Sequence, residues 1–500
     1  MTRRFLAAAV LPLLLLCLDS GTAFADASFR PASVGGYFRI MARPDFQGGN
    51  GRLGFWNLYG RLLNEGPWAA VELRLHLLPR ESGSRDVWTN LHLRIEGGAV
   101  RNAEASGGKL GEFAFSQLYV EAGNVLLDGV TWRLGTLQYQ YGDLGLYDMR
   151  PAELFFQTLG ISATLQKGPL ELMLGFGDSG FALGGFQYST VLSGGGAFRL
   201  RAPRHLEIGF GGQVNYEPRV EGNRNAPYDT PNVDYEDWVR GEIVQRYLED
   251  QPDQEDYFPK PVASNSLSFK GVGYIGFGDL GPLKWNSLFV NILRRHHDKS
   301  TVETFEGRDY DIFVKSLTDE RYEFNLGNEL QMEIVPGRFD LAWALLYGNH
   351  WDKDNDIAPS DADREILSTV LRLQAYFTPV VHLLIESSVA REVSRNGNTY
   401  RNHADSIFES SEGRPDSRGL EFGDADTRIT WQGKGGVVLN PLGAGIYVRP
   451  SLRILYGVQY SSMNNAFGNS FVETPSQYAL FDTVERHWHH VIAIEAEAWF

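Results

Sequence analysis

Two alternating segments near the ends of this 500-residue chain carry aromatic and charged side chains with a spacing of two. Tyr37 and Arg39 form the first set, and Glu495, Glu497 and Trp499 form the second. Successive side chains of an extended strand face opposite sides, so each set shares one face. Aromatic rings stack on the C–H faces of a pyranose, while carboxylates and guanidinium groups hydrogen-bond its hydroxyls. The two segments therefore have the chemistry of a weak, non-covalent site for polyhydroxylated molecules.

Covalent and metal chemistry have little support in the sequence. Cys17 is the only cysteine and lies in the N-terminal apolar run, and no Gly-x-Ser-x-Gly, P-loop or dinucleotide motif is present. The acidic run 352–356 begins like a calcium loop but continues with Ile357 where such a loop has glycine, so we interpret it as a solvated loop, with adventitious calcium as the alternative. The histidines within 487–490 alternate faces of a strand and cannot all converge on one metal ion. We expect neither an enzyme nor a cofactor or metal.

The elements that would position the aromatic and charged residues are short strands with a two-residue period. In the last segment, 491–500, apolar side chains on one face alternate with Glu495, Glu497 and Trp499 on the other, and the chain ends on an aromatic residue. Segments 71–77, 381–392 and 452–460 show the same alternation. Tilted strands of about 9–11 residues cross a bilayer, with apolar side chains toward lipid and polar ones toward a wet interior. We predict an all-β fold, a transmembrane antiparallel β-barrel of about 16–18 strands with 18 favoured. An edge strand of a soluble sandwich is the alternative for the last segment alone.

The N-terminus predicts export from the cytoplasm. Arg3 and Arg4 precede an apolar run over 5–17 and a small-x-small site at 23–25. We therefore predict a cleaved signal peptide at 1–25 and one barrel domain at 26–500. No other stretch approaches the roughly 18–20 apolar residues of a transmembrane helix, so strands must cross the membrane. The formal net charge of −16 argues against nucleic acid as a partner.

The polar stretches between strands fall into two length classes. The segments 216–264, 296–322, 349–365, 393–428 and 462–488 are long and polar, and we expect them to be extracellular loops. The stretches 279–282 and 440–443 contain Gly and Pro and are expected to be short periplasmic turns. A barrel of the predicted size holds an aqueous lumen.

Four sequence blocks resemble the maltoporin-like, sugar-specific porins of the bacterial outer membrane. They cover roughly the first 125 and the last 135 residues of the mature chain. The blocks are Gly36-Tyr-Phe-Arg39; Arg61-Leu-Leu-Asn-Glu65 with Val71-Glu-Leu73; Trp132 to Arg150; and, near the end, Phe377-Thr-Pro379, Tyr447-Val-Arg-Pro-Ser-Leu-Arg453 and Glu497-Ala-Trp-Phe500.

The resemblance implies roles for individual residues. It makes Tyr37 and Trp499 aromatic platforms of a sugar path. Beside them it implies a polar track of four residues, namely Arg39, Arg61, Glu72 and Glu497. It further implies an inward-folded constriction loop with three functional positions, namely Asp143, Asp148 and Arg150. Because the first and last strands of a closed barrel pair, we expect Tyr37 and Trp499 to lie near one another.

The sequence also departs from that family. Ala70 and Arg150 stand where the family has aromatics, as do Ile366 and Leu367, and these departures favour a shorter or more polar sugar over a maltodextrin. The predicted function is facilitated diffusion of oligosaccharides or other small hydrophilic solutes, including ions, by a homotrimer in contact with outer-membrane lipid and lipopolysaccharide. The alternatives are a polysaccharide export channel of the alginate-export type, which would use unpaired lumenal arginines such as Arg133, and a general diffusion porin.

Overall fold

A computed structural model describes most of the strands and the short connections of the chain. The described residues are 31–44, 51–54, 57–78, 86–98, 113–179, 191–203, 206–217, 266–294, 301–305, 308–312, 321–352, 364–394, 427–462 and 487–500. The expected signal peptide at 1–25 and the calcium-like run beyond Asp352 lie outside these residues.

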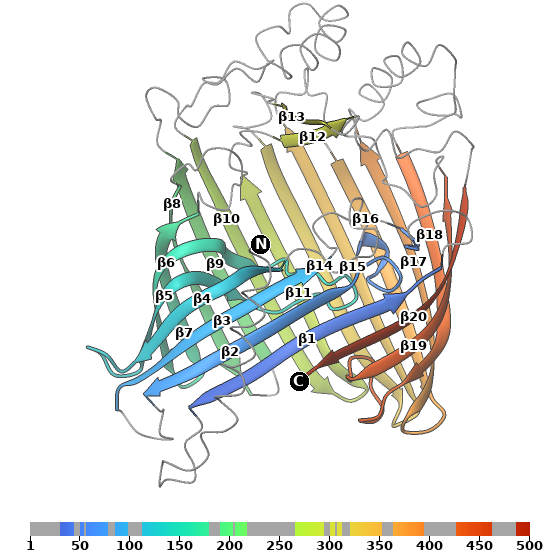
Figure 1. Ribbon diagram of the computed structural model, residues 1–500, viewed down its shortest axis with the longest axis horizontal. Coiled ribbons are helices and arrows are strands. Elements are labelled where there is room, and N and C mark those ends of the chain that lie inside the picture. The colour runs from blue at the N-terminus through green and yellow to red at the C-terminus, as the bar shows by residue number, and fades with distance from the viewer. Residues whose placement is uncertain are drawn as a thin grey trace, which may run out of the picture.

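Eighteen strands form one sheet that closes on itself (Figure 1). They are β1 (Ala32–Ala42), β2 (Trp68–Leu78), β3 (Trp88–Gly98), β4 (Phe113–Gly123), β5 (Val130–Gln140), β6 (Glu153–Lys167), β7 (Leu170–Asp178), β8 (Leu192–Ala202), β9 (Leu206–Glu217), β10 (Ser266–Leu280), β11 (Leu283–Arg294), β14 (Arg321–Val335), β15 (Phe339–Asp352), β16 (Arg364–Tyr376), β17 (Val381–Ser394), β18 (Thr427–Leu439), β19 (Ser451–Ser461) and β20 (Trp488–Trp499). A separate hairpin pairs β12 (Thr301–Phe305) with β13 (Arg308–Ile312), and η1 (Asn57–Tyr59) is a single 3₁₀ turn.

Each strand pairs antiparallel with its neighbours, and β1 pairs with β20 to close the barrel. In this seam Tyr37 lies opposite Trp499, and the backbone of Gly36 exchanges two hydrogen bonds with Phe500. The predicted antiparallel barrel of 18 strands is therefore confirmed. Closure leaves no unpaired edge, which is the condition for a sheet to cross a membrane.

The connections differ at the two ends of the barrel. At the end that contains the C-terminus they are short, as at 168–169, 281–282 and 336–338, and at the other end they are long. The expected turns at 279–282 and 440–443 both lie at the end with short connections. The connection 440–450 is longer than expected, however, and its second half enters the barrel, where Ile446 and Arg449 are buried.

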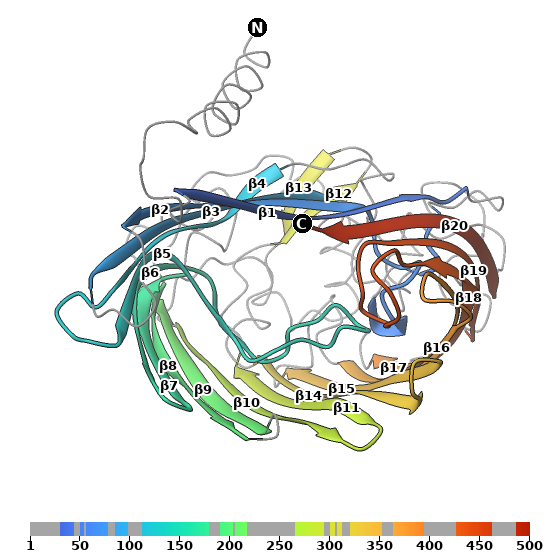
Figure 2. The same ribbon diagram turned by 90° about the horizontal axis from the view of Figure 1, so that it is seen from below.

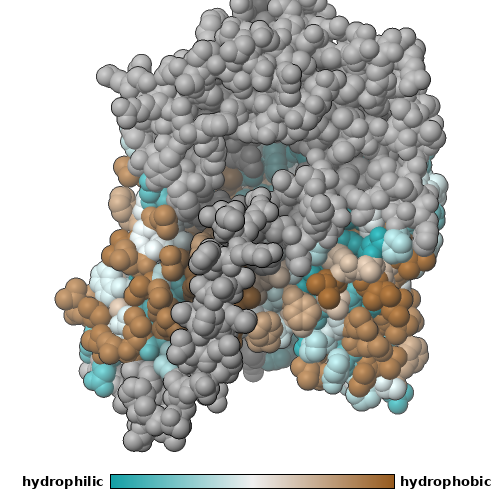
Figure 3. All heavy atoms as spheres, viewed as in Figure 1, coloured by the Kyte–Doolittle hydropathy of each residue, from teal (hydrophilic) through white to brown (hydrophobic). Residues whose placement is uncertain are grey.

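The outer face of the barrel is apolar and the inner face is polar. On β20, Ile492 and Ile494 are exposed outward, whereas Glu495 and Glu497 are buried inside. The same alternation holds along β16 to β19. In Figure 3 hydrophobic residues gather on the outer face of the strands at the left and right of the view. An apolar face toward lipid and a polar interior place this barrel in the bacterial outer membrane, in contact with its lipid. No helix among the described residues is long and apolar enough to span a membrane.

Candidate functional site: a constriction inside the barrel

Among the described residues, three non-strand segments lie inside the barrel. We call them the first inner segment (51–67, of which 55–56 are not described), the second inner segment (141–152) and the inner turn (440–450). Figure 2, which looks along the barrel, shows the second inner segment running from β5 across the interior toward η1, beside β16 and β17.

Polar groups on the wall hold the first inner segment. Lys434 on β18 donates from Nζ to the Tyr59 carbonyl at 2.8 Å, and Ser388 on β17 donates to the same carbonyl at 2.7 Å. The Lys434 ammonium also lies 2.8 Å from a Glu386 carboxylate oxygen, and Arg372 reaches the other oxygen of that carboxylate at 2.5 Å. Because these charges are buried, removing one partner would leave an unpaired buried charge, which would destabilise the protein. The cluster therefore fixes η1 to the wall.

Glycines in the wall make room for the second inner segment. A Cβ on Gly327 would lie 2.7 Å from Leu144, and one on Gly209 would lie 2.2 Å from the Tyr141 ring. Tyr147, at the tip of this segment, donates a hydrogen bond to the Ser368 carbonyl at 3.0 Å. Side chains larger than hydrogen at these wall positions would push the segment away from the wall.

The inner turn approaches from the periplasmic end and meets the second inner segment at Glu329. One oxygen of the Glu329 carboxylate accepts a hydrogen bond from the Tyr447 hydroxyl at 2.5 Å, and the other accepts from the Leu146 amide at 2.9 Å. Leu146 in turn accepts a backbone hydrogen bond from Arg61 at 2.8 Å. All three inner segments therefore form one connected body.

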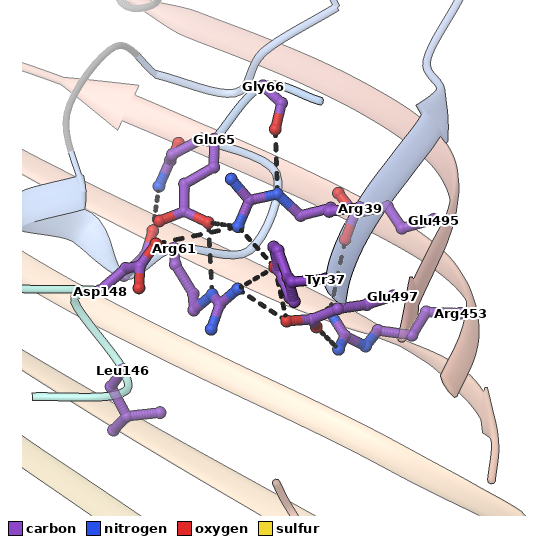
Figure 4. Close-up of polar contacts among 12 residues, drawn as sticks. Tyr37, Arg39, Arg61, Glu65, Gly66, Leu146, Asp148, Arg453, Glu495 and Glu497 are labelled. Carbon is purple, nitrogen blue, oxygen red and sulfur yellow. Dashed lines mark hydrogen bonds and ion pairs between the residues drawn. The ribbon is translucent and has the colours of Figure 1, made fainter. Parts of the chain in front are cut away.

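The two inner segments meet at a cluster of opposite charges (Figure 4). Arg39 on β1 contacts the Glu65 carboxylate and lies 3.9 Å from Asp148. Arg61 Nε is 3.3 Å from the same Glu65 oxygen. The residues come from β1 and from both inner segments, so the cluster joins the inner segments to the wall that closes the barrel.

Glu497 on β20 is the centre of the lower part of the cluster. Its Oε1 atom accepts hydrogen bonds from the Tyr37 hydroxyl at 2.9 Å and from Arg61 Nη2 at 2.8 Å. The Arg449 guanidinium lies 2.7 Å away as an ion pair, and Arg453 contacts the same carboxylate. Three arginines and a tyrosine thus hold one buried carboxylate, which makes its position rigid.

An aromatic pair lies beside this carboxylate. The ring centroids of Tyr37 and Trp499 are 5.8 Å apart at an angle of 31°, and the Arg449 guanidinium carbon is 5.6 Å from the Trp499 ring. The expectation that Tyr37 and Trp499 lie near one another is therefore confirmed. Trp499 is 52% exposed although it shares the inward face of Glu495 and Glu497, so part of its ring borders the lumen.

Burial and charge act in opposite directions on the two carboxyl groups of the inner segments. Burial raises the pKa of Glu65 to about 8, although Arg39 and Arg61 oppose this. The pKa of Asp148 is lowered, because Arg61 and Arg39 outweigh the effect of its partial burial and Glu65 donates a hydrogen bond to it. A neutral Glu65 beside an ionised Asp148 is the arrangement that we infer near neutral pH.

The other expected site residues are placed differently. Glu72 faces inward on β2 but pairs with Arg94 on β3 at 3.1 Å, away from the arginine cluster. Asp143 and Arg150 are exposed at the two ends of the second inner segment. The structure brings five of the expected site residues together in the charged cluster, namely Tyr37, Arg39, Arg61, Asp148 and Glu497.

The sequence reasoning missed three members of the cluster, namely Glu65, Arg449 and Arg453. Glu65 stands four residues after Arg61, and the two arginines belong to the block 447–453, so their types were visible. Their inward position depends on contacts between segments that are distant in the sequence. Among the described residues, no group of three or more His, Cys, Asp or Glu side chains is arranged to hold a metal ion.

The interior has a filled and an open half. The filled half comprises the inward faces of β9 to β11 and β14 to β20, against which the inner segments pack. There the Lys434 and Glu386 side chains are fully buried. The open half comprises the inward faces of β2 to β5, where Glu72 and Arg133 side chains are 40% and 26% exposed. Inward charges that remain exposed indicate a water-filled passage along the open half.

The chain is thus an outer-membrane β-barrel with the architecture of a porin. No protein-family model matches the sequence, and no curated protein is similar to it in sequence. Among solved structures it is similar to OccD3 (OpdP) of Pseudomonas aeruginosa, with a TM-score of 0.41, 8% identity and coverage of 94% of this chain and 91% of that one. It is also similar to the anion-selective porin from Comamonas acidovorans, with a TM-score of 0.39, 9% identity and coverage of 94% and 99%. Likeness at this level says nothing of the solute that this chain admits.

Proposed function

We propose that the protein is a passive outer-membrane porin that admits small hydrophilic solutes and ions, with neutral oligosaccharides as the favoured class. The observation that carries the proposal is the half-exposed Trp499 ring beside Tyr37 and a rigid network of charged groups. An aromatic face binds the C–H side of a sugar, while guanidinium and carboxylate groups on the same wall exchange hydrogen bonds with its hydroxyls.

The charge balance of the site supports neutral solutes over an acidic polymer. Four arginines (Arg39, Arg61, Arg449 and Arg453) contact carboxylates of the same cluster. The cluster also holds four carboxyl groups, namely Glu65, Asp148, Glu495 and Glu497. With Glu65 protonated near neutral pH, the four arginines exceed the three other carboxyl groups by one. Arg133 pairs with Glu121 at 2.7 Å. An export channel for acidic polysaccharide would need a ring of cationic groups left unneutralised around its path, which a single unpaired arginine does not provide.

The aromatic part of the path is short. Ala70 lies opposite Tyr37 on β2 and adds no ring, so the described seam offers two stacking residues. This limits favourable stacking to one or two sugar units at a time. Binding of that strength permits exit as well as entry, which a passive pore requires. The proposal involves transport without catalysis, and a homotrimer as the assembled form.

Reconstitution in planar bilayers tests the proposal. We expect an open pore whose current is blocked, saturably, by a neutral oligosaccharide. Trp499→Ala should weaken this block up to about tenfold, since such aromatic contacts are worth about 0.5–1.5 kcal/mol. Trp488→Ala is the matched control, because Trp488 is on the same strand but its side chain is exposed on the outer face.

Two other outcomes would contradict the carbohydrate proposal. Block by acidic polymer alone would identify an export channel, and a pore blocked by no saccharide would be a general diffusion porin. Migration of the folded protein as a monomer in size-exclusion chromatography with light scattering would contradict the trimer.

A further inference from the structure

A row of four side chains crosses the open half, one from each of β2, β3, β4 and β5. Arg74 lies directly opposite His92, and His92 lies directly opposite Tyr119. The His92 imidazole stacks on the Tyr119 ring with centroids 4.6 Å apart and planes 16° apart. The Arg133 guanidinium carbon lies 4.1 Å from the centre of the Tyr119 ring. Because β4 lies between β3 and β5, the imidazole and this guanidinium occupy opposite faces of the phenol ring.

Two members of this row have unused hydrogen-bonding capacity. His92 is 4% exposed, and neither of its ring nitrogens has a hydrogen-bond partner among the residues that the structure describes. Arg74 is exposed and forms no hydrogen bond or ion pair with any described residue. Buried polar groups in folded proteins are normally paired, so an imidazole without a partner needs an explanation.

The remaining charges of the row are already neutralised. Arg133 pairs with Glu121 at 2.7 Å. Glu72, the carboxylate closest to Arg74 along β2, is held by Arg94. With respect to the described residues, the row therefore presents one uncompensated positive charge, from Arg74, next to an imidazole with a free N–H.

The row lies on the route of a solute that has passed the aromatic pair. Tyr37 is opposite Ala70, and Arg74 follows Ala70 by four residues toward the periplasmic end of β2. At roughly 3.3 Å per residue this places the row about 13 Å beyond the aromatic pair. Both sites lie on the same wall of the lumen.

We propose that Arg74 and His92 form a second solute site that binds the carboxylate of a singly charged acidic sugar, and that this site extends the proposed porin function on which it rests. A carboxylate has two acceptor oxygens, which match the Arg74 guanidinium and the His92 N–H across the strand pair. Arg74 is exposed and lies directly opposite the buried imidazole on the neighbouring strand. In this proposal the Arg74 side chain turns when the carboxylate binds, and the ring edge becomes accessible. The stacked Tyr119 ring keeps the imidazole in place.

The test compares two disaccharides that differ by one carboxylate, cellobiouronic acid and cellobiose, as blockers of single-channel current. We expect the acidic sugar to stay in the wild-type pore about tenfold longer than the neutral one, as for a charge-assisted contact. Arg74→Gln should abolish the difference. His92→Phe preserves a ring on Tyr119 without nitrogens and should reduce the difference several-fold, while His92→Gln, which restores an N–H donor, should recover part of it.

Arg201→Gln is the matched control, because Arg201 is also an inward, exposed arginine but pairs with Glu171. It should leave both residence times unchanged. Equal residence of the two sugars in the wild-type pore, or an equal loss in R201Q and R74Q, would overturn the second site while the porin function stands. Absence of any pore current would instead overturn the proposed function.

Discussion

The filled and open halves of the barrel use the same residue types with opposite results. In the filled half Arg372, Glu386 and Lys434 form a buried cluster that holds the first inner segment. In the open half Glu72 and Arg94 form a similar ion pair that remains in water. Burial is what distinguishes them, since buried charges depend on their partners whereas exposed pairs contribute little to stability. Inward charges therefore serve as structural anchors on one side and as the lining of the passage on the other.

The largest effect is expected where the buried cluster is broken. Glu386→Leu leaves the Arg372 and Lys434 charges without their shared carboxylate, which should cost about 3–5 kcal/mol of unfolding free energy. Release of η1 should also raise the single-channel conductance and its noise. Glu72→Leu makes the same replacement in the open half and should cost less than about 1 kcal/mol. Urea unfolding of the folded barrel in detergent measures both, and equal losses would contradict the division into two halves.

Two glycines of β9 can be used to test how the second inner segment packs against the barrel wall. A Cβ on Gly209 would lie 2.2 Å from the Tyr141 ring, whereas one on Gly212 would have no neighbour closer than 3.5 Å. Gly209→Ala should therefore destabilise the protein by about 1–3 kcal/mol through overpacking, and it should change the conductance. Gly212→Ala should have an effect below about 0.5 kcal/mol. An unchanged conductance in G209A would show that the segment does not narrow the pore.

Asp148 lies at the boundary between the two halves, with its side chain half exposed. Asp148→Asn removes one negative charge from the constriction and should shift ion selectivity toward anions by about two-fold to three-fold. The reversal potential in a KCl gradient measures this change. Asp128→Asn, in the periplasmic turn between β4 and β5, is the control and should leave the reversal potential where it was.

The smallest effect concerns the protonation of Glu65, whose pKa is raised to about 8 mainly by burial. As the pH rises from 6 to 9 this carboxyl group loses its proton, and the constriction gains one negative charge. Selectivity should therefore move toward cations over this interval, by less than about two-fold. Glu65→Gln should remove the dependence, and a shift of the same size in E65Q would assign it to another group.

From the sequence, the side chains could be assigned to the inner or outer face of each strand. The arrangement of the segments inside the barrel could not be predicted as well. A period of two fixes which side chains share a face, so Trp499 could be placed beside Glu497, and closure of the barrel placed it near Tyr37. The inner turn was expected to be a short periplasmic turn, because no local pattern shows that 444–450 folds back into the lumen. Its position follows from the contact of Tyr447 with Glu329, 118 residues away.

Local patterns also could not show that Glu72 lies apart from the other residues of the expected polar track. Glu72 has the right type and face but lies on β2, where Arg94 on the neighbouring strand is its partner. His489 was considered only as one of the histidines within 487–490 that cannot converge on a metal ion. It is buried on the inner face of β20, where it contacts the Leu53 carbonyl at 3.3 Å. In both cases the partner is fixed by strand register or by a segment from a distant part of the chain.

The pairing of β1 with β20 has a consequence for how the protein is made. Residues 37 to 42 pair with residues 494 to 499 along the seam between β1 and β20, so the barrel cannot close until the last residues have been synthesised and exported. Contacts between residues that are so far apart in the sequence form slowly, because almost the entire chain must be ordered first. The pairing of the two ends of the chain is therefore expected to be a late step of folding, after the strands between them have formed their hairpins.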